Sequence, residues 1–393
     1  MTDLPQRALV LGLARSGLAA AAVLERRGVE VRRADRELGN DDDLSLLDGA
    51  GLLVKSPGVP REAPLVAAAR ERGVPVWSEV ELGYRLLRSP ILGVTGTNGK
   101  TTTAEWVGFM LGAPVAGNVG RALTELDGQV EPGRLVVCEL SSFQLEDIHE
   151  FRAQIAVLLN LEPDHLDQHG TFDAYRDAKL RVFENQTGED TAVVPRGFPE
   201  VPGAAGRVEF SADDPLPAEL RLPGAHNREN AAAAVVAARA AGASEEAIAH
   251  GLAEFPGVPH RLELVDERGG VRYVNDSKAT NVAAALRGLA AYADVPVHLI
   301  LGGSRKGEDF APLAAAMGPN VRSVHVIGET ADELAVVIPN AVRSGDLETA
   351  LRSIDPEPGD VVLLSPACAS YDQFRDFEER GEEFRRLVEN LPM

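Results

Sequence analysis

Cysteine is scarce in this chain of 393 residues, which has only Cys138 and Cys368, far apart in the sequence. Two isolated cysteines offer neither the closely spaced ligand pairs of a structural zinc site nor a disulfide framework. Their scarcity argues against a small secreted domain held by disulfides, and it is typical of a reducing compartment. We therefore predict that the protein is cytoplasmic.

Long apolar runs are missing as well. No run approaches the ~20 residues that a membrane-spanning helix needs. Met1 is followed by Thr-Asp-Leu-Pro-Gln-Arg, which lacks the apolar core of a signal peptide. From these two features we expect no association with a membrane.

Basic residues are outnumbered, with 39 Lys and Arg against 60 Asp and Glu and a formal net charge of -21. Nucleic acids and anionic membranes bind to basic surfaces, so this charge argues against both as partners. An anionic ligand would have to be held locally, by individual cations, helix N-termini or metal ions. We therefore expect small-molecule substrates and no nucleic acid.

What the chain does have is an alternation of short apolar runs with alanine-rich stretches from end to end. This alternation predicts an α/β fold with mainly parallel sheets. We divide the chain into segments 1–90, 91–257 and 258–393, because the helix-breaking stretch Phe-Pro-Gly-Val-Pro at 255–259 suits a linker. Two or three domains are also expected from the length.

The most informative stretch is Gly-Thr-Asn-Gly-Lys-Thr at 96–101, between the apolar run 91–94 and the helix-like segment 102–110. A strand, a glycine-rich turn and a helix N-terminus form a phosphate cradle, because glycines let backbone N–H groups approach phosphate oxygens. Lys100 would neutralise the terminal phosphates, and the Thr101 hydroxyl would hold Mg²⁺. The spacing departs from the usual P-loop, and the alternative is an ordinary glycine turn before a helix.

A carboxylate stands at the end of the next strand-like run, 135–138, which leads into Glu139. At the end of a strand that neighbours a phosphate loop, such a group is placed to bind nucleotide-associated Mg²⁺. A solvated glutamate at the end of a strand would give the same pattern, so both interpretations stay open.

Acids and histidines gather in the stretch 160–169, which follows the apolar run 155–159. Sites of α/β proteins are assembled at such positions, after the carboxyl ends of parallel strands. His165 could bind a second Mg²⁺ or the reacting phosphate, although a lone histidine is more often structural. We interpret Asp167 and His169 as loop structure.

Three other residues of the second segment have ordinary explanations. Lys179 lies in a helical stretch and reads as a surface lysine by pattern alone. Asn227 and Asn230 open a helix predicted over 227–241, where Asn227 would be the N-cap. Hydrogen bonding of the two asparagines to a nucleotide is the alternative.

The first segment opens with a strand-like run at 8–11, a turn at 12–17, and a second strand at 29–34 that ends at Asp35. This order resembles a dinucleotide-binding βαβ unit, but Ala14 replaces the middle glycine of that fingerprint. A nicotinamide oxidoreductase is therefore an alternative function. The missing glycine and the phosphate loop both oppose it.

Polar loops follow three strand-like runs of the third segment, at 275–281, 302–307 and 365–374. They place small residues and hydroxyls at the ends of strands, as anion sites require. Two of them also carry a cation, Lys278 or Lys306. We expect these loops to share one sheet edge and to form a carboxylate-binding site.

Taken together, these motifs resemble the Mur ligases of peptidoglycan precursor synthesis, over essentially the whole chain. The loop at 96–101 is shared with folylpolyglutamate synthases, whereas 139–145, 275–281 and 365–377 are more specific. The resemblance is strongest to the members that add D-glutamate to UDP-N-acetylmuramoyl-L-alanine. Another Mur ligase or a folylpolyglutamate synthase is the nearest alternative, and the Ser-Ser-Phe-Gln-Leu and Ala-Cys-Ala-Ser stretches argue against both.

The resemblance implies a Rossmann-like N-terminal domain for the UDP moiety, a central P-loop-type ATPase domain, and a Rossmann-like C-terminal domain for the amino acid. It implies ATP, two Mg²⁺ ions and a CO₂-derived carbamate on Lys179, in a monomeric chain. The catalytic residues would be Lys100, Glu139, His165 and Lys179. The metal ligands would be Thr101, Glu139, His165 and Lys179.

The other implied contacts form one set for each substrate. ATP would be bound by Gly96, Thr97, Asn98, Gly99, Lys100, Thr101, Thr102, Asn227, Asn230, Arg261 and Asp276. The UDP substrate would be bound by Arg15, Ser16, Asp35, Arg36, Gly58, Asn118 and His165. D-glutamate would be bound by Lys278, Thr280, Lys306, Ser370 and Phe377.

The implied reaction is an ATP-dependent amide-bond formation. A carboxylate has a poor leaving group, so ATP first converts it to an acyl phosphate, which the amine of D-glutamate then attacks. Cations are needed because a carboxylate and a γ-phosphate repel each other. A non-catalytic nucleotide-binding switch is the remaining alternative, and its ATP use would not depend on an amino acid.

Overall fold

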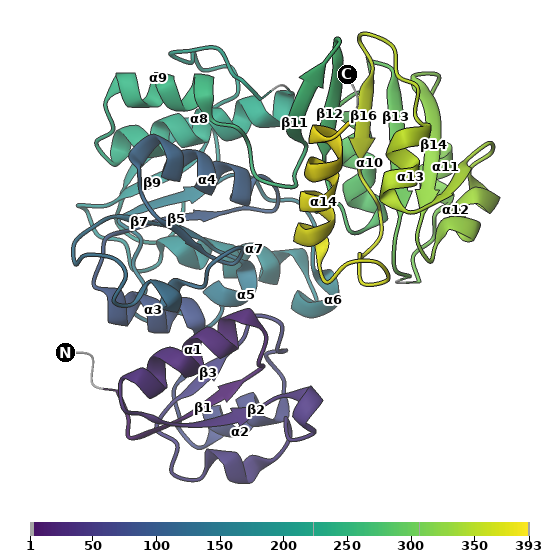
Figure 1. The fold of residues 1–393 in the computed structure, drawn as a ribbon. Coiled ribbons are helices and arrows are strands. Elements are labelled where there is room, and N and C mark those ends of the chain that lie inside the picture. The colour runs from purple at the N-terminus through teal and green to yellow at the C-terminus, as the bar shows by residue number, and fades with distance from the viewer. Residues whose placement is uncertain (1–3, 223, 306, 392–393) are drawn as a thin grey trace. The chain divides into compact units, whose positions relative to one another are not determined.

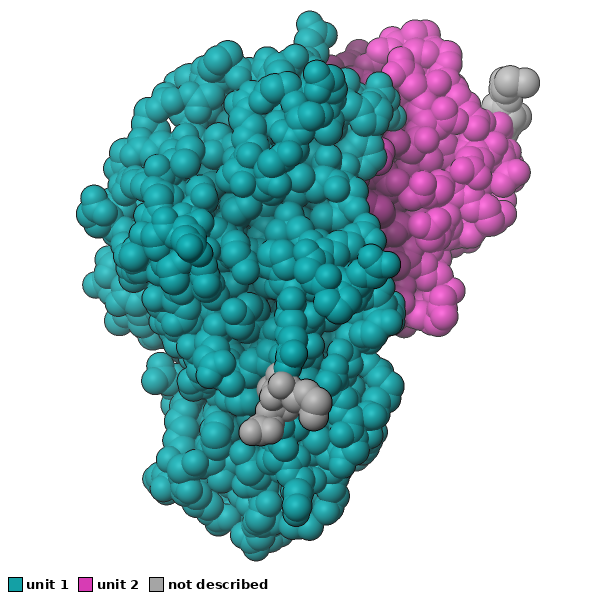
Figure 2. Space-filling model, turned by 90° about the vertical axis from the view of Figure 1, so that its left-hand side faces the viewer, with its two compact units in different colours: residues 1–255 teal, residues 256–393 magenta. Residues whose placement is uncertain are grey.

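The structure is a computed structural model that describes residues 4–222, 224–305 and 307–391. By its contacts the chain divides into two compact units, Met1–Phe255 and Pro256–Met393 (Figure 2). Three mainly parallel sheets with flanking helices carry the fold, which confirms the predicted α/β class (Figure 1). Each of the three predicted segments contains one of these sheets. Within the described ranges no helix is long and apolar enough to span a bilayer.

The first sheet has four parallel strands in the order β2-β1-β3-β4. Its turn after β1 needs glycine, because Gly12 has φ +86° and a Cβ on Gly17 would lie 1.8 Å from the Gly12 carbonyl oxygen. The elements are β1 Arg7–Leu11, α1 Arg15–Arg26, β2 Glu30–Ala34, η1 Arg36–Leu38, η2 Leu44–Leu47, β3 Leu53–Lys55, α2 Pro64–Glu71, β4 Val76–Ser78 and α3 Glu79–Leu87.

The second sheet has six strands in the order β10-β9-β8-β5-β7-β6, and every neighbouring pair is parallel. The strands of this sheet and the helices between them begin, in chain order, with β5 Ile91–Thr95, α4 Lys100–Leu111, β6 Val115–Gly117, η3 Leu123–Leu126, β7 Val136–Glu139, α5 Ser142–Leu145 and β8 Ile155–Leu158. They continue with α6 Leu166–His169, α7 Phe172–Leu180, η4 Arg181–Phe183, β9 Thr191–Pro195, β10 Gly206–Phe210, α8 Ala225–Ala240 and α9 Glu245–Glu254.

The register of this sheet places the candidate residues. Val94 of β5 pairs with Glu139 of β7, and Thr95 pairs with Leu158 of β8. The carboxyl ends of parallel strands meet at one edge of the sheet. The phosphate loop therefore starts between Glu139 on one side and the segment after β8 on the other.

The third sheet, in the second unit, has the order β11-β12-β16-β13-β14-β15. Only the β11–β12 pair is antiparallel. Since β16 lies between β12 and β13, the loops after these three strands share one edge. The elements are β11 Glu263–Arg268, β12 Val271–Asn275, α10 Val282–Ala290, β13 Val297–Gly302, α11 Ala311–Ala315, β14 Val321–Ile327, α12 Ala331–Val337, β15 Val342–Gly345, α13 Leu347–Ser353, β16 Val361–Leu364 and α14 Phe377–Glu389.

Two buried glutamates two positions apart on α3 have different surroundings. The Glu81 carboxylate accepts backbone N–H bonds of 2.9–3.2 Å from residues 149–151 and pairs with Arg85 at 2.6 Å. The Glu79 Oε1 accepts from the amide and hydroxyl of Thr124, but its Oε2 has no hydrogen-bond partner within the described part of the chain. Burial raises the pKa of Glu79 to about 7.

Glu81→Gln should therefore destabilise the fold more than Glu79→Gln. An amide at position 81 turns one acceptor into a donor facing backbone N–H groups and removes the charge partner of Arg85, at a cost of roughly 2–3 kcal/mol. An amide at position 79 keeps an oxygen for Thr124 and replaces a carboxyl that burial already drives towards neutrality, at a cost below about 1 kcal/mol. Urea unfolding of both variants at pH 7 measures the difference, and equal losses would contradict this account.

Candidate active site

The phosphate loop lies between β5 and α4, with Gly99 as the N-cap of the helix. Both glycines are required by their backbone and their neighbours. Gly96 has φ +151° and would place a Cβ 2.9 Å from the Leu159 Cβ, whereas Gly99 has φ +82° and would place one 2.1 Å from Asn230 Oδ1. The first-turn amides of α4 are thus left uncovered by a side chain at Gly99, as an anion cradle requires.

The segment after β8 holds this loop in shape. The amide of Thr97 donates to the Asn160 carbonyl at 3.0 Å, and the amide of Asn98 donates to Asn160 Oδ1 at 2.8 Å. The Thr97 hydroxyl lies 2.9 Å from the Tyr175 hydroxyl on α7. The Asn98 side chain donates to Glu162 at 2.9 Å. These contacts shape the loop before any ligand is bound.

Lys100 lies over the loop from the first turn of α4. Its Nζ donates to the carbonyl oxygens of Gly96 and Thr97 at 3.0 and 2.9 Å. The next two residues, Thr101 and Thr102, are buried. Both residues belong to the first turn of α4, beside which the predicted Mg²⁺ would lie.

Glu139 is buried at the end of β7, so the alternative of a solvated glutamate is wrong. Its Oε1 accepts a hydrogen bond of 3.1 Å from the Asn118 side chain, and its backbone carbonyl accepts from the Asn118 amide at 2.9 Å. The structure thus brings together two residues that the resemblance assigned to different ligands, one to metal and one to the UDP substrate.

Lys179 is also buried, with 2% of the residue exposed, so its interpretation as a surface lysine is wrong. Its Nζ donates to the Gly96 carbonyl at 2.8 Å and lies 4.8 Å from the centre of the Tyr175 ring. Burial first, and the nearby Lys100 second, lower the pKa of Lys179 to about 7. Two ammonium groups therefore meet at one carbonyl oxygen, that of Gly96.

His165 lies at the start of α6 with φ +51°, in the left-handed region. Its amide donates to Asp164 Oδ1 at 2.9 Å, and its ring lies 5.0 Å from that of Phe143. The prediction that Asp167 and His169 are loop residues is wrong, because both belong to the single-turn helix α6. This correction has a tertiary cause: α6 packs on α5 and α7, contacts that no local pattern encodes.

Asn227 is not the N-cap of its helix, because α8 begins two residues earlier with Gly224 as its cap. Asn227 lies in the first turn and is half-buried. Asn230, one turn further on, is buried with its side chain against Gly99. The helix thus brings one of the two predicted asparagines into contact with the phosphate loop.

The N-terminal candidates lie around the turn after β1. The Asp35 carboxylate accepts the amides of Glu37 and Leu13 at 2.9 and 2.5 Å, and these two bonds lower its pKa. Arg15 Nη1 donates to the carbonyl of Gly120 at 2.8 Å, so the turn contacts the segment that follows β6. The other predicted residues here are half-buried or exposed, and they are Ser16, Arg36 and Gly58.

In the second unit, the predicted ATP ligand Asp276 has a strongly shifted pKa. It is buried, and it accepts from Ser365 Oγ at 2.7 Å and from the Leu262 amide at 3.2 Å. Burial raises its pKa to about 7. Leu262 directly follows Arg261 in the sequence. Its hydrogen bond to Asp276 therefore brings the backbone next to Arg261 close to Asp276, and both Arg261 and Asp276 are predicted to bind ATP.

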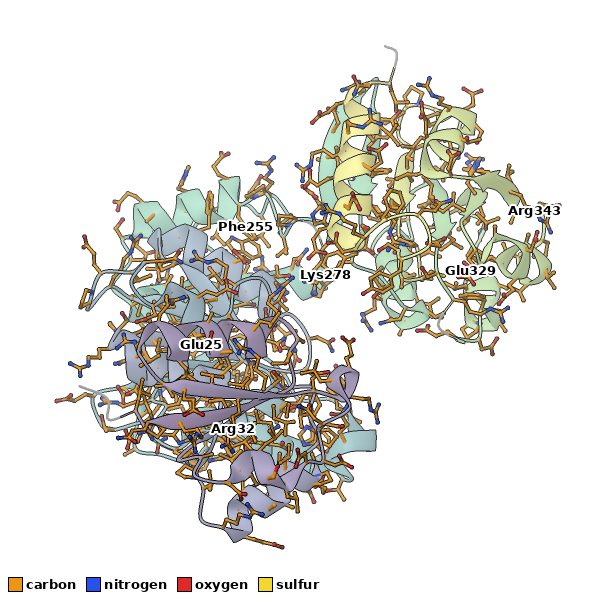
Figure 3. The ribbon with its side chains drawn as sticks, turned by 60° about the horizontal axis from the view of Figure 1, so that its bottom comes forward. Glu25, Arg32, Phe255, Lys278, Glu329 and Arg343 are labelled. Atoms are coloured by element: carbon orange, nitrogen blue, oxygen red, sulfur yellow. The ribbon has the colours of Figure 1, made fainter. Side chains whose placement is uncertain are left out.

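The predicted D-glutamate residues follow β12 and β16. Lys278, labelled in Figure 3, places its Nζ 5.7 Å from the centre of the Phe377 ring. The amide of Thr280 donates to the Lys278 carbonyl at 2.9 Å, and Ser370 is buried. Lys306 lies outside the described residues.

Arg380 on α14 is a residue that sequence reasoning missed. It is 1% exposed, and its guanidinium donates to the carbonyls of Ser277, Cys368 and Ala369 at 2.9, 3.0 and 3.1 Å. Burial lowers its pKa to about 10. One arginine therefore ties the loop after β12 to the loop after β16. No signal in the sequence distinguishes it from Arg385 and Arg386 of the same helix, which are half-buried and exposed.

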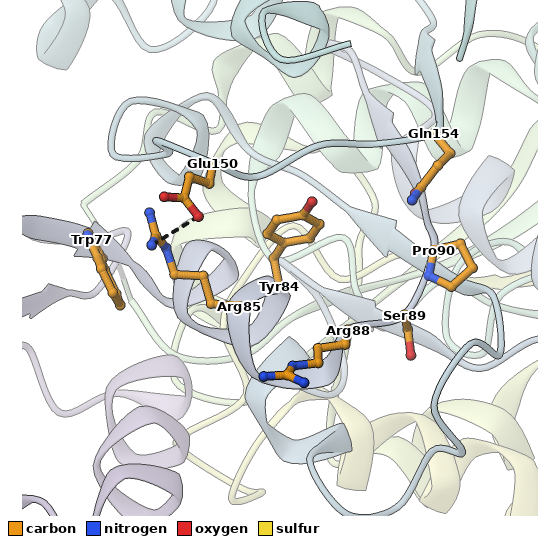
Figure 4. A pocket seen from close by; sticks show the side chains of 8 residues that line it. All are labelled: Trp77, Tyr84, Arg85, Arg88, Ser89, Pro90, Glu150 and Gln154. Atoms are coloured by element: carbon orange, nitrogen blue, oxygen red, sulfur yellow. Dashed lines mark ion pairs between the residues drawn. The ribbon is translucent and has the colours of Figure 1, made fainter. Parts of the chain in front are cut away.

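Two cavities of the first unit are lined by residues outside the phosphate loop. One, of about 610 Å³, is lined by Trp77, Tyr84, Arg85, Arg88, Ser89, Pro90, Glu150 and Gln154 (Figure 4). Arg85 stacks 4.2 Å from the Trp77 ring and pairs with Glu150 at 3.1 Å, so the charges in it are partly matched. The second, of about 640 Å³, reaches Phe143 and His169. None of the residues predicted as ligands lines the first cavity.

Comparison with known proteins assigns the family. The Mur ligase middle domain matches residues 94–206, and the Mur ligase glutamate ligase domain matches residues 260–368. The UDP-N-acetylmuramoylalanine–D-glutamate ligase of Anaeromyxobacter dehalogenans is 44% identical over 97% of both chains. The ligase of the same name from Geobacillus kaustophilus is 41% identical over 98% of both. The chain belongs to the Mur ligases, in the D-glutamate ligase group.

Solved structures of other Mur ligases have the same fold. The MurF ligase of Thermotoga maritima, in complex with ADP, matches with a TM-score of 0.61 at 17% identity over 99% of both chains. The MurC ligase of the same organism matches with 0.59 at 18% identity, over 98% of this chain and 99% of that one.

The family confirms the predicted resemblance and excludes the nicotinamide oxidoreductase as the function of this Mur ligase. Neither the fold nor the family names test the role of any single residue. The assignments to ATP, metal, UDP substrate and D-glutamate, and the boundaries at 90 and 257, stay predictions.

Gly99→Ala should weaken nucleotide binding, whereas Gly112→Ala should only reduce stability. Both glycines have positive φ at opposite ends of α4, but a Cβ at Gly112 meets nothing within 4 Å. At Gly99 it collides with the Asn230 side chain, so the turn that opens the phosphate cradle must shift and the dissociation constant of ATP should rise at least about tenfold. At Gly112 the cost should be roughly 1 kcal/mol of unfolding free energy. Calorimetric titration and thermal unfolding of both variants check this, and equal ATP affinity would contradict it.

Proposed function

We propose that this Mur ligase uses ATP to join D-glutamate to UDP-N-acetylmuramoyl-L-alanine through an acyl phosphate, in peptidoglycan precursor synthesis. The observation that carries this proposal is the identity of 39–44% to ligases of that name over nearly the whole of both chains. The geometry supports it, because the loop at 96–101 is a preformed anion cradle with two lysines beside it.

The chemistry requires charge to be neutralised. The terminal phosphate of ATP and the carboxylate of the nucleotide substrate repel each other until cations lie between them. Lys100 is held at the first turn of α4, where the helix amides and its ammonium would bind the phosphates. Asn227, Asn230, Arg261 and Asp276 would complete the ATP site.

The oxygen groups around the loop fit Mg²⁺. Thr101 is buried in the first turn of α4, and Glu139 is a buried carboxylate at the adjacent strand end. Hydroxyl and carboxylate oxygens are the ligands that Mg²⁺ prefers. Bound there, the ion would offset the charge on the transferred phosphoryl group. A second ion would be held by His165 and Lys179.

An unmodified lysine fits a metal site badly, because its ammonium repels a cation. Lys179 is suited to modification, since its pKa of about 7 leaves much of the amine neutral at neutral pH. A neutral amine attacks CO₂ to give a carbamate, with the C–N bond formed and one proton released. The carbamate oxygens would turn Lys179 from a cation into an anionic ligand.

The substrates would bind to separate parts of the chain. The UDP substrate would contact Asn118 and His165 and the N-terminal turn with Arg15, Ser16, Asp35, Arg36 and Gly58. D-glutamate would contact Lys278, Thr280, Lys306, Ser370 and Phe377, where the ammonium of Lys278 supplies the positive charge for its carboxylates. We propose a cytoplasmic monomer with these small-molecule partners alone.

The test is the amino-acid dependence of ADP release with UDP-N-acetylmuramoyl-L-alanine and ATP. D-glutamate should support turnover, and L-lysine or diaminopimelate should not. The product should have the mass of the nucleotide substrate plus one glutamyl residue. Lys100→Ala should lower the rate of ADP release at least about a hundredfold. ADP release without any amino acid would instead support a nucleotide-binding switch.

Carbamate formation on Lys179 should depend on pH. The folded-state pKa lies below that of a free lysine, so the neutral amine is gained as the pH rises through about 7. With ¹³C-labelled CO₂ at fixed dissolved concentration, the carbamate signal should therefore rise between pH 6 and pH 8. Lys179→Ala should lack the signal and lose activity, which short carboxylates should partly restore. Full activity of that variant without them would contradict the carbamate.

A further inference from the structure

A buried chain of polar contacts runs from Glu146 through His169 to Ser142. Glu146 Oε1 lies 3.2 Å from His169 Nδ1, and His169 Nε2 lies 3.0 Å from Ser142 Oγ. The side chain of His169 is 2% exposed, and Ser142 is buried. An ionised carboxylate only accepts, so Nδ1 carries a proton towards Glu146, and Nε2 is the nitrogen that meets the Ser142 hydroxyl.

Phe143 links this chain to His165. Its ring stacks on His169 at 5.0 Å with an interplanar angle of 7°, and its edge meets His165 at 5.0 Å and 65°. Tyr175 of α7 lies against His169 as well, with ring centres 5.3 Å apart. The imidazole therefore contacts two aromatic rings as well as Ser142 and Glu146, and these contacts together fix its orientation.

The polar contacts join α5 and α6, two helices that are too short to be stable without packing. α5 and α6 have four residues each, less than the length at which a helix is stable alone. α5 begins three residues after Glu139, and α6 begins immediately after His165. The sheet register fixes Glu139 at the end of β7, and the contacts between these two turns therefore set where the start of α6, with His165, lies relative to it.

We infer that His169 is a positioning residue that holds the segments of Glu139 and His165 at the separation needed for metal binding. The inference rests on the proposed function, in which these two residues are ligands of separate Mg²⁺ ions. His169 would act through Ser142 and Phe143 rather than by touching a substrate. Partners that orient metal ligands in this way commonly change metal affinity when they are removed.

The decisive variant is His169→Phe. It keeps a planar ring of similar size against Phe143 but removes both polar contacts, the one with Glu146 and the hydrogen bond with Ser142. The Mg²⁺ concentration at half-maximal ADP release should rise at least about tenfold. The KM for D-glutamate should stay within about twofold, because the residues proposed to bind it lie in the second unit.

A second readout does not depend on activity. Mn²⁺ is titrated into the protein with a non-hydrolysable ATP analogue, and the free ion is followed by electron paramagnetic resonance. His169→Phe should weaken Mn²⁺ binding at least about tenfold. His169→Gln keeps an amide that can reach Ser142 and should restore most of the affinity. Ser142→Ala breaks the same chain from its other end and should weaken binding in the same direction.

His325→Phe is the matched control. His325 is also a buried histidine bonded through both ring nitrogens, to Ser323 at 3.0 Å and to Ser353 at 3.0 Å, but it lies in the second unit. It should lose a similar amount of thermal stability and keep its metal dependence.

The outcomes separate the inference from the proposed function. Unchanged Mn²⁺ affinity in His169→Phe, or an equal loss in His325→Phe, would overturn the positioning role. No Mn²⁺ binding by the unsubstituted chain would overturn it too. If the unsubstituted chain binds Mn²⁺ but shows no D-glutamate-dependent ADP release, the proposed function fails, and the titration still decides the role of His169.

Discussion

The carbonyl oxygen of Gly96 is the point on which the candidate site depends, because two lysine ammonium groups donate to it. Lys100 reaches it from α4 and Lys179 from α7, at 3.0 and 2.8 Å. Burial disfavours the charged form of Lys179, and the like charge of Lys100 adds to this, so the pKa of Lys179 falls to about 7. In the proposed function, the same contact would position one cation for phosphate and prepare the other amine for modification.

That contact exists because of the sheet order. β5 lies between β7 and β8, so the segments after all three strands meet at one edge. Glu139 comes from one neighbour, and Asn160, which shapes the loop, comes from the other. In a chain with a net charge of -21, this edge is where local cations and amides can outweigh the acidic surroundings.

Burial accounts for most of the differences between prediction and structure. Lys179 reads as a surface residue by local pattern, since a lysine in a polar helical stretch is normally solvated. No local pattern marks the buried roles of His169 and Arg380, because their partners are distant in the sequence. Glu146 lies 23 residues from His169, and Ser277 lies 103 residues from Arg380. The helix boundary at Ala225 also moved, since the chain opens α8 with Gly224 rather than with the asparagine that cap statistics favour.

Contiguous residues are enough to predict the alternation of strands and helices, the phosphate loop and the family. Strand ends and glycine turns are local, so Gly96, Gly99 and Glu139 could be selected without coordinates. The three-dimensional fold is needed to see that Lys179 is buried beside Gly96, that Asn230 contacts Gly99, and that Arg380 joins two loops. These are contacts between distant segments, and their energies depend on burial and distance that no local pattern contains.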